Sequence, residues 1–294
     1  MPLSSMRCAK LAKIIGVLLL GAALYGCSAI KLAYNNLPEF TYWWLDGYLD
    51  FNGAQSPRVK EQLAQLLAWH RKNELPKLIA LIQKAEQMAP NDVTPTQVCA
   101  FTEEVRARLL AVAMQASQPG AELAVSLGDA QLQQLERKYA KNNADYTSDW
   151  LERSPTRQHQ KRYDEFLERN EDFYGPLDAD QRRLMRQLTD RSIFDPGRVD
   201  AERRQRQQES LVLLRGFSNS VAPSSEVRTA IDSYVKRIAD PPAGAWRDYQ
   251  LALLQEGCSN VAALHNTTRP AQREQAVRRL RAYEQDLRDL MAAH

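Results

Sequence analysis

The sequence predicts an all-α protein, a multi-helix bundle of amphipathic helices joined by short turns. Three observations support this fold class. Ala, Leu, Gln, Glu and Arg are abundant and glycine is sparse, with 12 in 294 residues, and these five residue types are good helix formers. Apolar residues recur at three- and four-residue intervals along most of the chain. No stretch alternates apolar and polar residues for long enough to predict a strand.

Residues 1–26 have the layout of a secretory signal peptide. Three basic residues precede an apolar run over residues 14–24, and the small residue Gly26 follows. The basic residues are Arg7, Lys10 and Lys13. A positive segment, a short apolar segment and a small residue before the cleavage point are typical of such signals. An uncleaved membrane anchor over residues 14–30 is the alternative, at the lower length limit of a spanning helix.

The Leu24-Tyr25-Gly26-Cys27 sequence resembles the lipobox of bacterial lipoproteins. The resemblance implies cleavage after Gly26, a diacylglycerol group on the sulfur of Cys27 and an N-acyl chain on its new amine. Two or three acyl chains hold a protein firmly on a membrane, at roughly 0.8 kcal/mol per buried methylene. Because Ser28 and not Asp follows Cys27, the resemblance further implies the outer membrane, with the protein facing the periplasm.

The remaining chain is expected to form a lipidated N-terminus and tether over residues 27–37 and a helical domain over residues 38–294. This length can bury a sizeable core, in one bundle or in two sub-bundles that meet near residues 175–200. The chain has 39 Lys and Arg against 36 Asp and Glu, and the excess of three lies in the signal peptide. The rest is formally neutral, so its charge does not favour a nucleic-acid partner.

An aromatic, amphipathic helix is expected to open at Pro38, since proline suits the first turn of a helix. Apolar residues recur at helical spacing over residues 37–49. Some of its large rings are expected to fill the core, and others to lie against membrane headgroups or a partner. The rings in question are Tyr42, Trp43, Trp44 and Tyr48.

Four short motifs lie between Cys27 and Pro76. They are Tyr34-Asn35-Asn36-Leu37, Trp44-Leu45-Asp46-Gly47-Tyr48-Leu49-Asp50, Trp69-His70-Arg71 and Leu75-Pro76. In these motifs the chain resembles an uncharacterised family of proteobacterial lipoproteins, a domain-of-unknown-function family. The resemblance implies a helical lipoprotein and no established activity.

From residue 55 onwards, amphipathic helices are expected to follow one another with short turns between them. Proline, glycine, asparagine and aspartate mark the turns at residues 89–91, 118–120, 175–176, 195–197, 240–242 and 268–270. The expected helices cover residues 57–72, 75–88, 95–116, 129–142, 155–170, 179–193, 199–217, 224–238, 243–265 and 270–293.

Four helix openings share a pattern of an apolar residue, a capping residue and a glutamine, at residues 51–55, 93–97, 127–131 and 177–181. The capping side chain can accept hydrogen bonds from free amides while the glutamine reaches back, which makes a capping box. The expected pairs are Asn52 with Gln55, Thr94 with Gln97 and Asp178 with Gln181. The segments also resemble the Leu-Thr-x-x-Gln helix openings of Spy-like periplasmic chaperones, which are small all-helical cradles. Plain capping is the alternative interpretation.

Two thiols remain once Cys8 leaves with the signal peptide and Cys27 is lipidated. Cys99 and Cys258 would then lie in an oxidising compartment, where an even number of cysteines favours a disulfide. Two separate buried thiols are the alternative.

The sequence contains no recognisable catalytic or metal-binding constellation. None of its four histidines has a second His or Cys three or four residues away, as a metal-binding pair on a helix requires. No nucleophile elbow, phosphate-binding glycine loop or dinucleotide fingerprint occurs. His70 is interpreted as a structural histidine at a helix end. We therefore expect a non-enzymatic protein with no metal and no cofactor beyond the acyl groups on Cys27.

Three functions remain open. The first is a binding or chaperone-like module of the cell envelope, which takes a protein partner or an unfolded client in the periplasm. The second is a structural, envelope-maintenance lipoprotein that engages another envelope protein, and the third is an unrecognised enzyme. An apolar groove favours the first, a flat apolar patch the second, and a closed pocket with converging ionisable groups the third.

Overall fold

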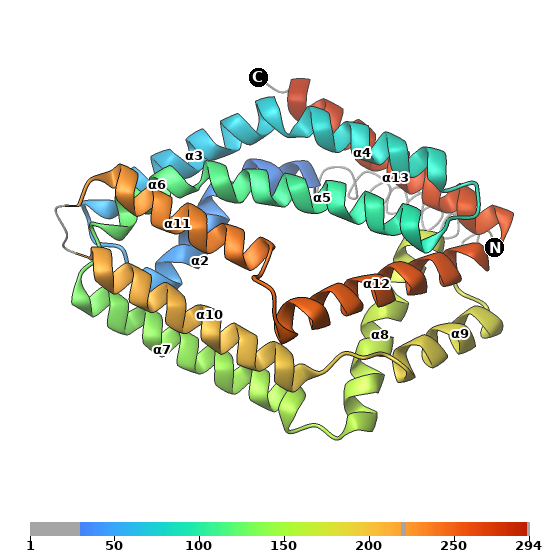
Figure 1. Ribbon diagram of the computed structural model, residues 1–294. Helices are drawn as coiled ribbons and strands as arrows, with labels where there is room; N and C mark the ends of the chain where they lie inside the picture. The colour runs from blue at the N-terminus through green and yellow to red at the C-terminus, as the bar shows by residue number, and fades with distance from the viewer. Residues whose placement is uncertain (1–29, 219–221, 293–294) are drawn as a thin grey trace, which may run out of the picture.

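The computed structural model describes residues 30–218 and 222–292 (Figure 1). Helices make up most of these residues and no strand occurs among them, which confirms the predicted all-α fold. The signal peptide expected at residues 1–26 and the lipidation site Cys27 lie outside the described residues. Within the described residues, no helix has both the length and the apolar character needed to cross a bilayer.

The helices follow one another with short connections, as the turn residues predict. In chain order they are α2 (Leu37–Leu49), α3 (Gln55–Asn73), α4 (Leu75–Met88), α5 (Pro95–Gln115), α6 (Ser117–Ala124), α7 (Asp129–Tyr146), a π-helical turn (Thr147–Leu151), α8 (Pro155–Tyr174), α9 (Ala179–Asp190), α10 (Pro196–Phe217), α11 (Ser224–Ala239), α12 (Ala245–Asn266) and α13 (Pro270–Ala292).

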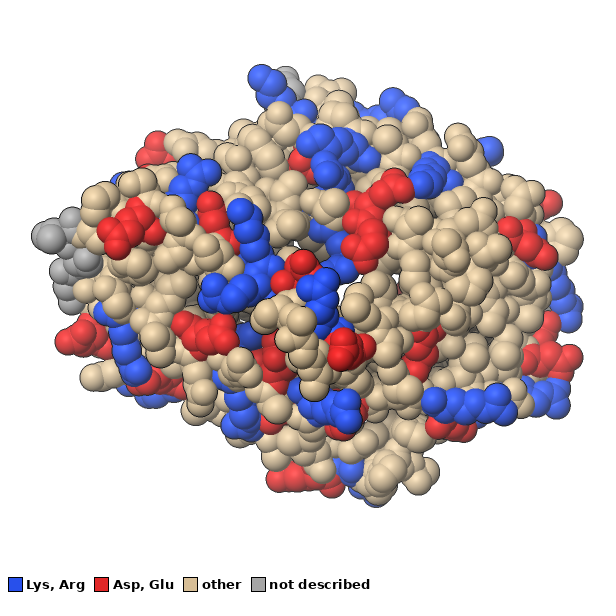
Figure 2. Space-filling view, viewed as in Figure 1, with Lys and Arg blue, Asp and Glu red and all other residues tan. Residues whose placement is uncertain are grey.

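The molecule is elongated, with α3, α4 and α13 along one side and α7 and α10 along the other (Figure 1). The C-terminal helices return to the N-terminal ones, because α13 packs along α4, α12 along α5 and α11 against α6. On the face shown in Figure 2, Lys and Arg side chains are interspersed with Asp and Glu. This face therefore has no large area of one sign of charge. The division of the domain into two sub-bundles stays a prediction.

Helix α6 differs from the sequence-based expectation of a turn at residues 118–120. The chain forms a new helix there because Pro119 is the third residue of α6, and the first turn of a helix needs no amide donor from proline. Ala121 and Ala124 on α6 are almost fully buried and pack with Val227 of α11. Tertiary burial thus stabilises a short helix that begins with residues typical of a turn.

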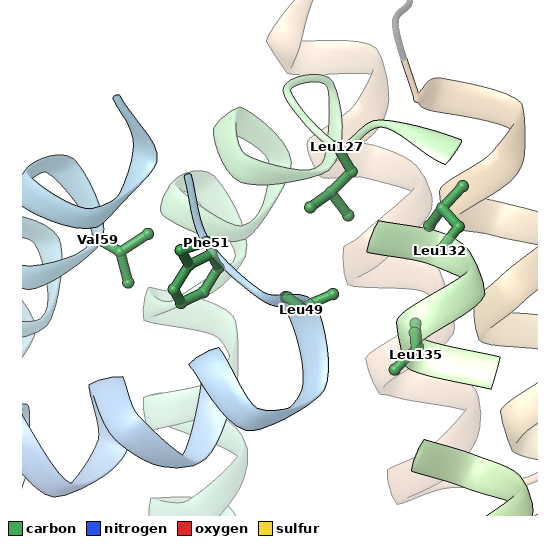
Figure 3. Packing of buried hydrophobic residues seen from close by; sticks show 6 residues of the cluster. All are labelled: Leu49, Phe51, Val59, Leu127, Leu132 and Leu135. Carbon is green, nitrogen blue, oxygen red and sulfur yellow. The ribbon is translucent and has the colours of Figure 1, made fainter. Parts of the chain in front are cut away.

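One hydrophobic core lies where α2, α3 and α7 meet (Figure 3). The chain leaves α2 at Asp50 with a positive φ of 50°, a conformation that Asp tolerates better than most residues. The Asp46 carboxylate accepts a hydrogen bond from the Phe51 amide (2.8 Å) and holds this turn. The core residues are Leu49, Phe51, Val59, Leu127, Leu132 and Leu135.

A second core lies at the junction of α8, α9, α12 and α13. Its buried members are Tyr174, Leu177, Met185, Leu264 and Ala276. His265 is buried beside it, with its Nε2 atom 2.8 Å from the carbonyl oxygen of Asn91 and its Nδ1 atom 2.9 Å from the Tyr174 hydroxyl. Because a carbonyl only accepts, Nε2 carries a proton, and in the neutral ring Nδ1 accepts from the tyrosine. Burial lowers the pKa of His265 and so favours this neutral form.

Acidification is expected to destabilise the fold through His265. Burial lowers the pKa of this ring below its ordinary value, so the unfolded chain binds more protons near neutral pH. The stabilisation is complete above about pH 6.5 and is lost as the pH falls below it, by at most about 1.4 kcal/mol per pH unit. Urea unfolding of the wild type and of His265→Gln, above and below about pH 6.5, measures the loss.

The substitution should weaken this pH dependence, and the remainder includes His70, whose pKa burial also lowers. His159→Gln is the matched control, since the His159 side chain is 38% exposed and lies 3.5 Å from Asp190. Equal pH dependence in the wild type and His265→Gln would contradict the assignment of a buried neutral ring.

Candidate binding site

A cavity of about 440 Å³ lies between α8, α9, α12 and the segment that joins α9 to α10. Its walls are mostly apolar, and Gly257 on α12 leaves space at one side. The apolar and aromatic side chains that line it are Trp150, Phe166, Met185, Leu188, Phe194, Leu253, Val261 and Leu264. Val261, one of the lining residues, is exposed to solvent. An apolar cavity with few polar groups is typical of a binding site.

Three polar side chains hold the segment that borders the cavity. Arg162 on α8 donates to the Ser192 hydroxyl (2.7 Å), and that hydroxyl donates to the carboxylate of Glu256 on α12. The other Glu256 oxygen accepts from the Ile193 amide (2.7 Å). The next turn is held by Tyr249, whose hydroxyl accepts from the Asp195 amide (2.7 Å). These bonds tie the α9–α10 segment to α8 and α12.

The aromatic rings at this border stack against cations. The Arg162 guanidinium lies 4.3 Å from the centre of the Phe194 ring, and Trp150 meets Phe194 edge to face at 5.4 Å. Lys161 lies 4.6 Å from the centre of the Trp150 ring. Burial lowers the pKa of Arg162, and Glu256 opposes that shift, so the cavity contains a partly desolvated cation beside apolar walls. Such a site suits apolar groups that carry a hydrogen-bond acceptor.

The structure contains the disulfide that the cysteine count predicts. Cys99 on α5 is bonded to Cys258 on α12, with Cα atoms 5.4 Å apart. Cys258 is almost fully buried, and Gly257 beside it lines the cavity. The disulfide therefore holds the helix that forms one wall of the site.

The structure places the three capping pairs at helix starts. Asn52 accepts from the amides of Ala54 and Gln55, both at 3.0 Å, and Thr94 and Asp178 form complete capping boxes with Gln97 and Gln181. None of these residues lines the cavity. Within each helix start, the pattern is thus explained by helix capping.

Two of the capping glutamines also join helices that are distant in sequence. The side-chain amide of Gln55 donates to Gln131 (3.2 Å), and that of Gln131 donates back (2.8 Å). Gln181 and Gln272 form the same reciprocal pair, at 2.8 and 3.0 Å. Sequence reasoning missed Gln272, although its side chain accepts from the Arg269 amide three residues earlier (3.0 Å). Gln272 stands three residues after Arg269 at the start of α13, the same spacing as in the other helix openings, and this spacing could have identified it.

The large rings of α2 divide between the core and the surface. Tyr42 and Tyr48 pack against the first core, whereas Trp43 and Trp44 are exposed. His70 Nδ1 lies 2.9 Å from the Tyr34 hydroxyl. Among the described residues, no group of three His, Cys, Asp or Glu side chains could hold a metal ion.

The model of a family of unknown function, DUF6279, matches residues 47–224, which is more than half of the chain. The chain belongs to this family. The DUF6279 match contains α8, α9 and the segment between α9 and α10, whereas α12 lies outside it. A search of the curated proteins found no match, and a search of the solved structures found none. The expected likeness to Spy-like chaperones therefore rests on the helix openings alone.

Proposed function

We propose that this protein is a non-enzymatic binding module of the cell envelope, held at the periplasmic face of the outer membrane by the acyl groups on Cys27. Its binding site is the apolar cavity between α8, α9 and α12, and its ligand is an apolar segment of polypeptide. The observation that supports the proposal is the cavity itself, which combines apolar walls with the half-buried guanidinium of Arg162. The lipobox resemblance supports the location.

The chemistry of the cavity fits a peptide better than a reaction. Phe166, Met185 and Leu253 line it with side chains that bind apolar groups of varied shape. The Ser192 hydroxyl accepts from Arg162 and donates to Glu256, and Glu256 also accepts from the Ile193 amide, so these polar groups bond to one another and hold the α9–α10 segment. Arg162 can donate to a carbonyl of the bound segment. Apolar contact would supply the affinity, and this hydrogen bond would set the direction of the segment.

Placing a charge at the border of the cavity is expected to weaken client binding. The variant Val261→Arg puts a guanidinium on the exposed part of the cavity lining, and Val261 is exposed enough that the fold tolerates it. We expect a loss of affinity of about tenfold or more for an unfolding client protein, equivalent to about 1.4 kcal/mol. The measurement is the suppression of client aggregation by the full-length protein at near-equal molar ratio.

Val212→Arg is the matched control, because Val212 is an exposed valine on α10 that is not part of the cavity. It should suppress aggregation as the wild type does. If both variants behave alike, or if the wild type neither holds clients nor cross-links to an envelope protein, the proposed function is wrong.

A further inference from the structure

One helical face of the N-terminal segment is exposed and apolar. The helix at residues 30–35 continues into α2, because the Asn36 amide donates to the Leu32 carbonyl (3.1 Å) and the Phe40 amide to the Asn36 carbonyl (3.0 Å). At about 100° per residue, its exposed large apolar residues fall within about 160° of arc. They are Ile30, Leu32, Leu37, Phe40, Trp43 and Trp44.

This face reverses the usual pattern of a surface helix, whose outer side is charged. The charged residues over 30–48 are Lys31, Glu39 and Asp46, and the Glu39 side chain, which is 44% exposed, is paired with Lys60 (2.9 Å). Trp43 and Trp44 are each 61% exposed, and Leu32 is 66% exposed. The remaining exposed residues of the stretch are Ala33, Asn35, Asn36 and Gly47. Isolated exposed apolar residues are common, but a contiguous apolar face marks an interaction surface.

The opposite side of the segment is fixed to the rest of the domain. The Lys31 ammonium forms ion pairs with Asp289 and, at 3.7 Å, with the buried Asp286 of α13. The Tyr34 hydroxyl lies 2.9 Å from His70 Nδ1 on α3, and Arg71 donates to Asn35 (2.7 Å). The expected tether thus lies partly outside the described residues, and from residue 30 it is helical and bonded to α3 and α13. Its apolar face cannot turn inward without breaking these contacts.

The sequence before this segment indicates what covers the face. The membrane attachment lies at Cys27 if residues 1–26 are cleaved as a lipoprotein signal, and in the apolar run at residues 14–24 if that run stays as an anchor. Two residues separate Cys27 from Ile30 and five separate Leu24 from Ile30, and extended chains of these lengths reach at most about 10 Å and about 20 Å. The face itself, from Ile30 to Trp44, is about 20 Å long. The bilayer is therefore within reach of the whole face.

We propose that the exposed face of residues 30–44 lies in the headgroup region of the phospholipid bilayer. Tryptophan rings are enriched at this depth because they have an apolar body and a polar N–H group. The face would then fix how the domain is oriented on the membrane, rather than leave it free on a flexible tether. The inference rests on the membrane anchor of the proposed function and adds a second contact with the same membrane.

Quenching of tryptophan fluorescence tests this contact in the full-length protein. The protein is reconstituted into phosphatidylcholine vesicles with and without bromine on the acyl chains close to the headgroups. We expect the brominated lipid to quench the wild type, and Trp43→Phe with Trp44→Phe to remove most of that quenching. The matched control removes two other indoles, Trp150→Phe with Trp246→Phe, and should keep the quenching.

Flotation of the vesicles separates the two ways in which the inference could fail. If the protein does not float with the vesicles, the membrane anchor is wrong and the inference fails with it. If the protein floats but the two double variants lose quenching equally, or the wild type shows none, the anchor stands and the contact of the α2 face is wrong. Circular dichroism of each variant confirms that the helices have formed.

Discussion

Replacement of Cys99 and Cys258 by serine is expected to lower the free energy of unfolding by about 4–5 kcal/mol. The disulfide joins residues that are 159 positions apart, so its loss releases a long loop in the unfolded chain and favours that state. Guanidinium unfolding of the double variant and of the oxidised wild type measures the difference. Because a typical domain is stable by about 5–15 kcal/mol, this loss is a large fraction of the total.

Reduced wild-type protein is the control for this substitution, since it breaks the same bond without changing a side chain. Both forms should unfold at the same, lower guanidinium concentration. The double variant is also expected to bind clients less tightly. Gly257, which lines the cavity, directly precedes Cys258, so loss of the disulfide frees this wall of the cavity from α5. Peptide mapping without reductant that finds no linked pair would contradict the disulfide in the native protein.

The substitution Gln131→Leu is expected to lower the free energy of unfolding by about 3 kcal/mol. The Gln131 side chain donates to the carbonyls of Leu49 (2.9 Å) and Asp50 (3.2 Å) and to Gln55 (2.8 Å). It also accepts from the Gly128 amide (3.1 Å). Leucine satisfies none of these groups, and a buried polar group without a partner costs about 1–3 kcal/mol. Equilibrium unfolding in urea measures the effect.

Gln97→Leu is the matched control, because Gln97 is exposed and its hydrogen bonds go to Thr94 of its own capping box. Loss of the hydrogen bonds that the Gln97 side chain makes in this capping box should lower the free energy of unfolding by about 1 kcal/mol or less. Equal losses in the two variants would show that the glutamines act only as local caps. A larger loss for Gln131→Leu would show that the pair it forms with Gln55 stabilises the junction of α3 and α7.

Local signals predicted most of the helices because each signal depends on only a few neighbouring residues. The capping residue Asp178 and its glutamine define the start of α9, and Pro95 and Pro270 each stand at the first position of a helix. Helix α6 was missed because its stability comes from burial of Ala121 against α11, which no local pattern shows. The partner of Gln181 was missed for the same reason, since Gln272 lies 91 positions away.

By itself the sequence determined the all-α fold and most of the helices and favoured the pairing of Cys99 with Cys258, since propensity, capping and cysteine number depend on residue types and short spacings. The tertiary structure decided where the cavity lies and which rings of α2 stay exposed. Arg162 and Glu256 meet at the α9–α10 segment although 94 positions separate them. Such contacts depend on how helices pack across the whole chain, because side chains distant in sequence become neighbours only when their helices bury apolar surface together.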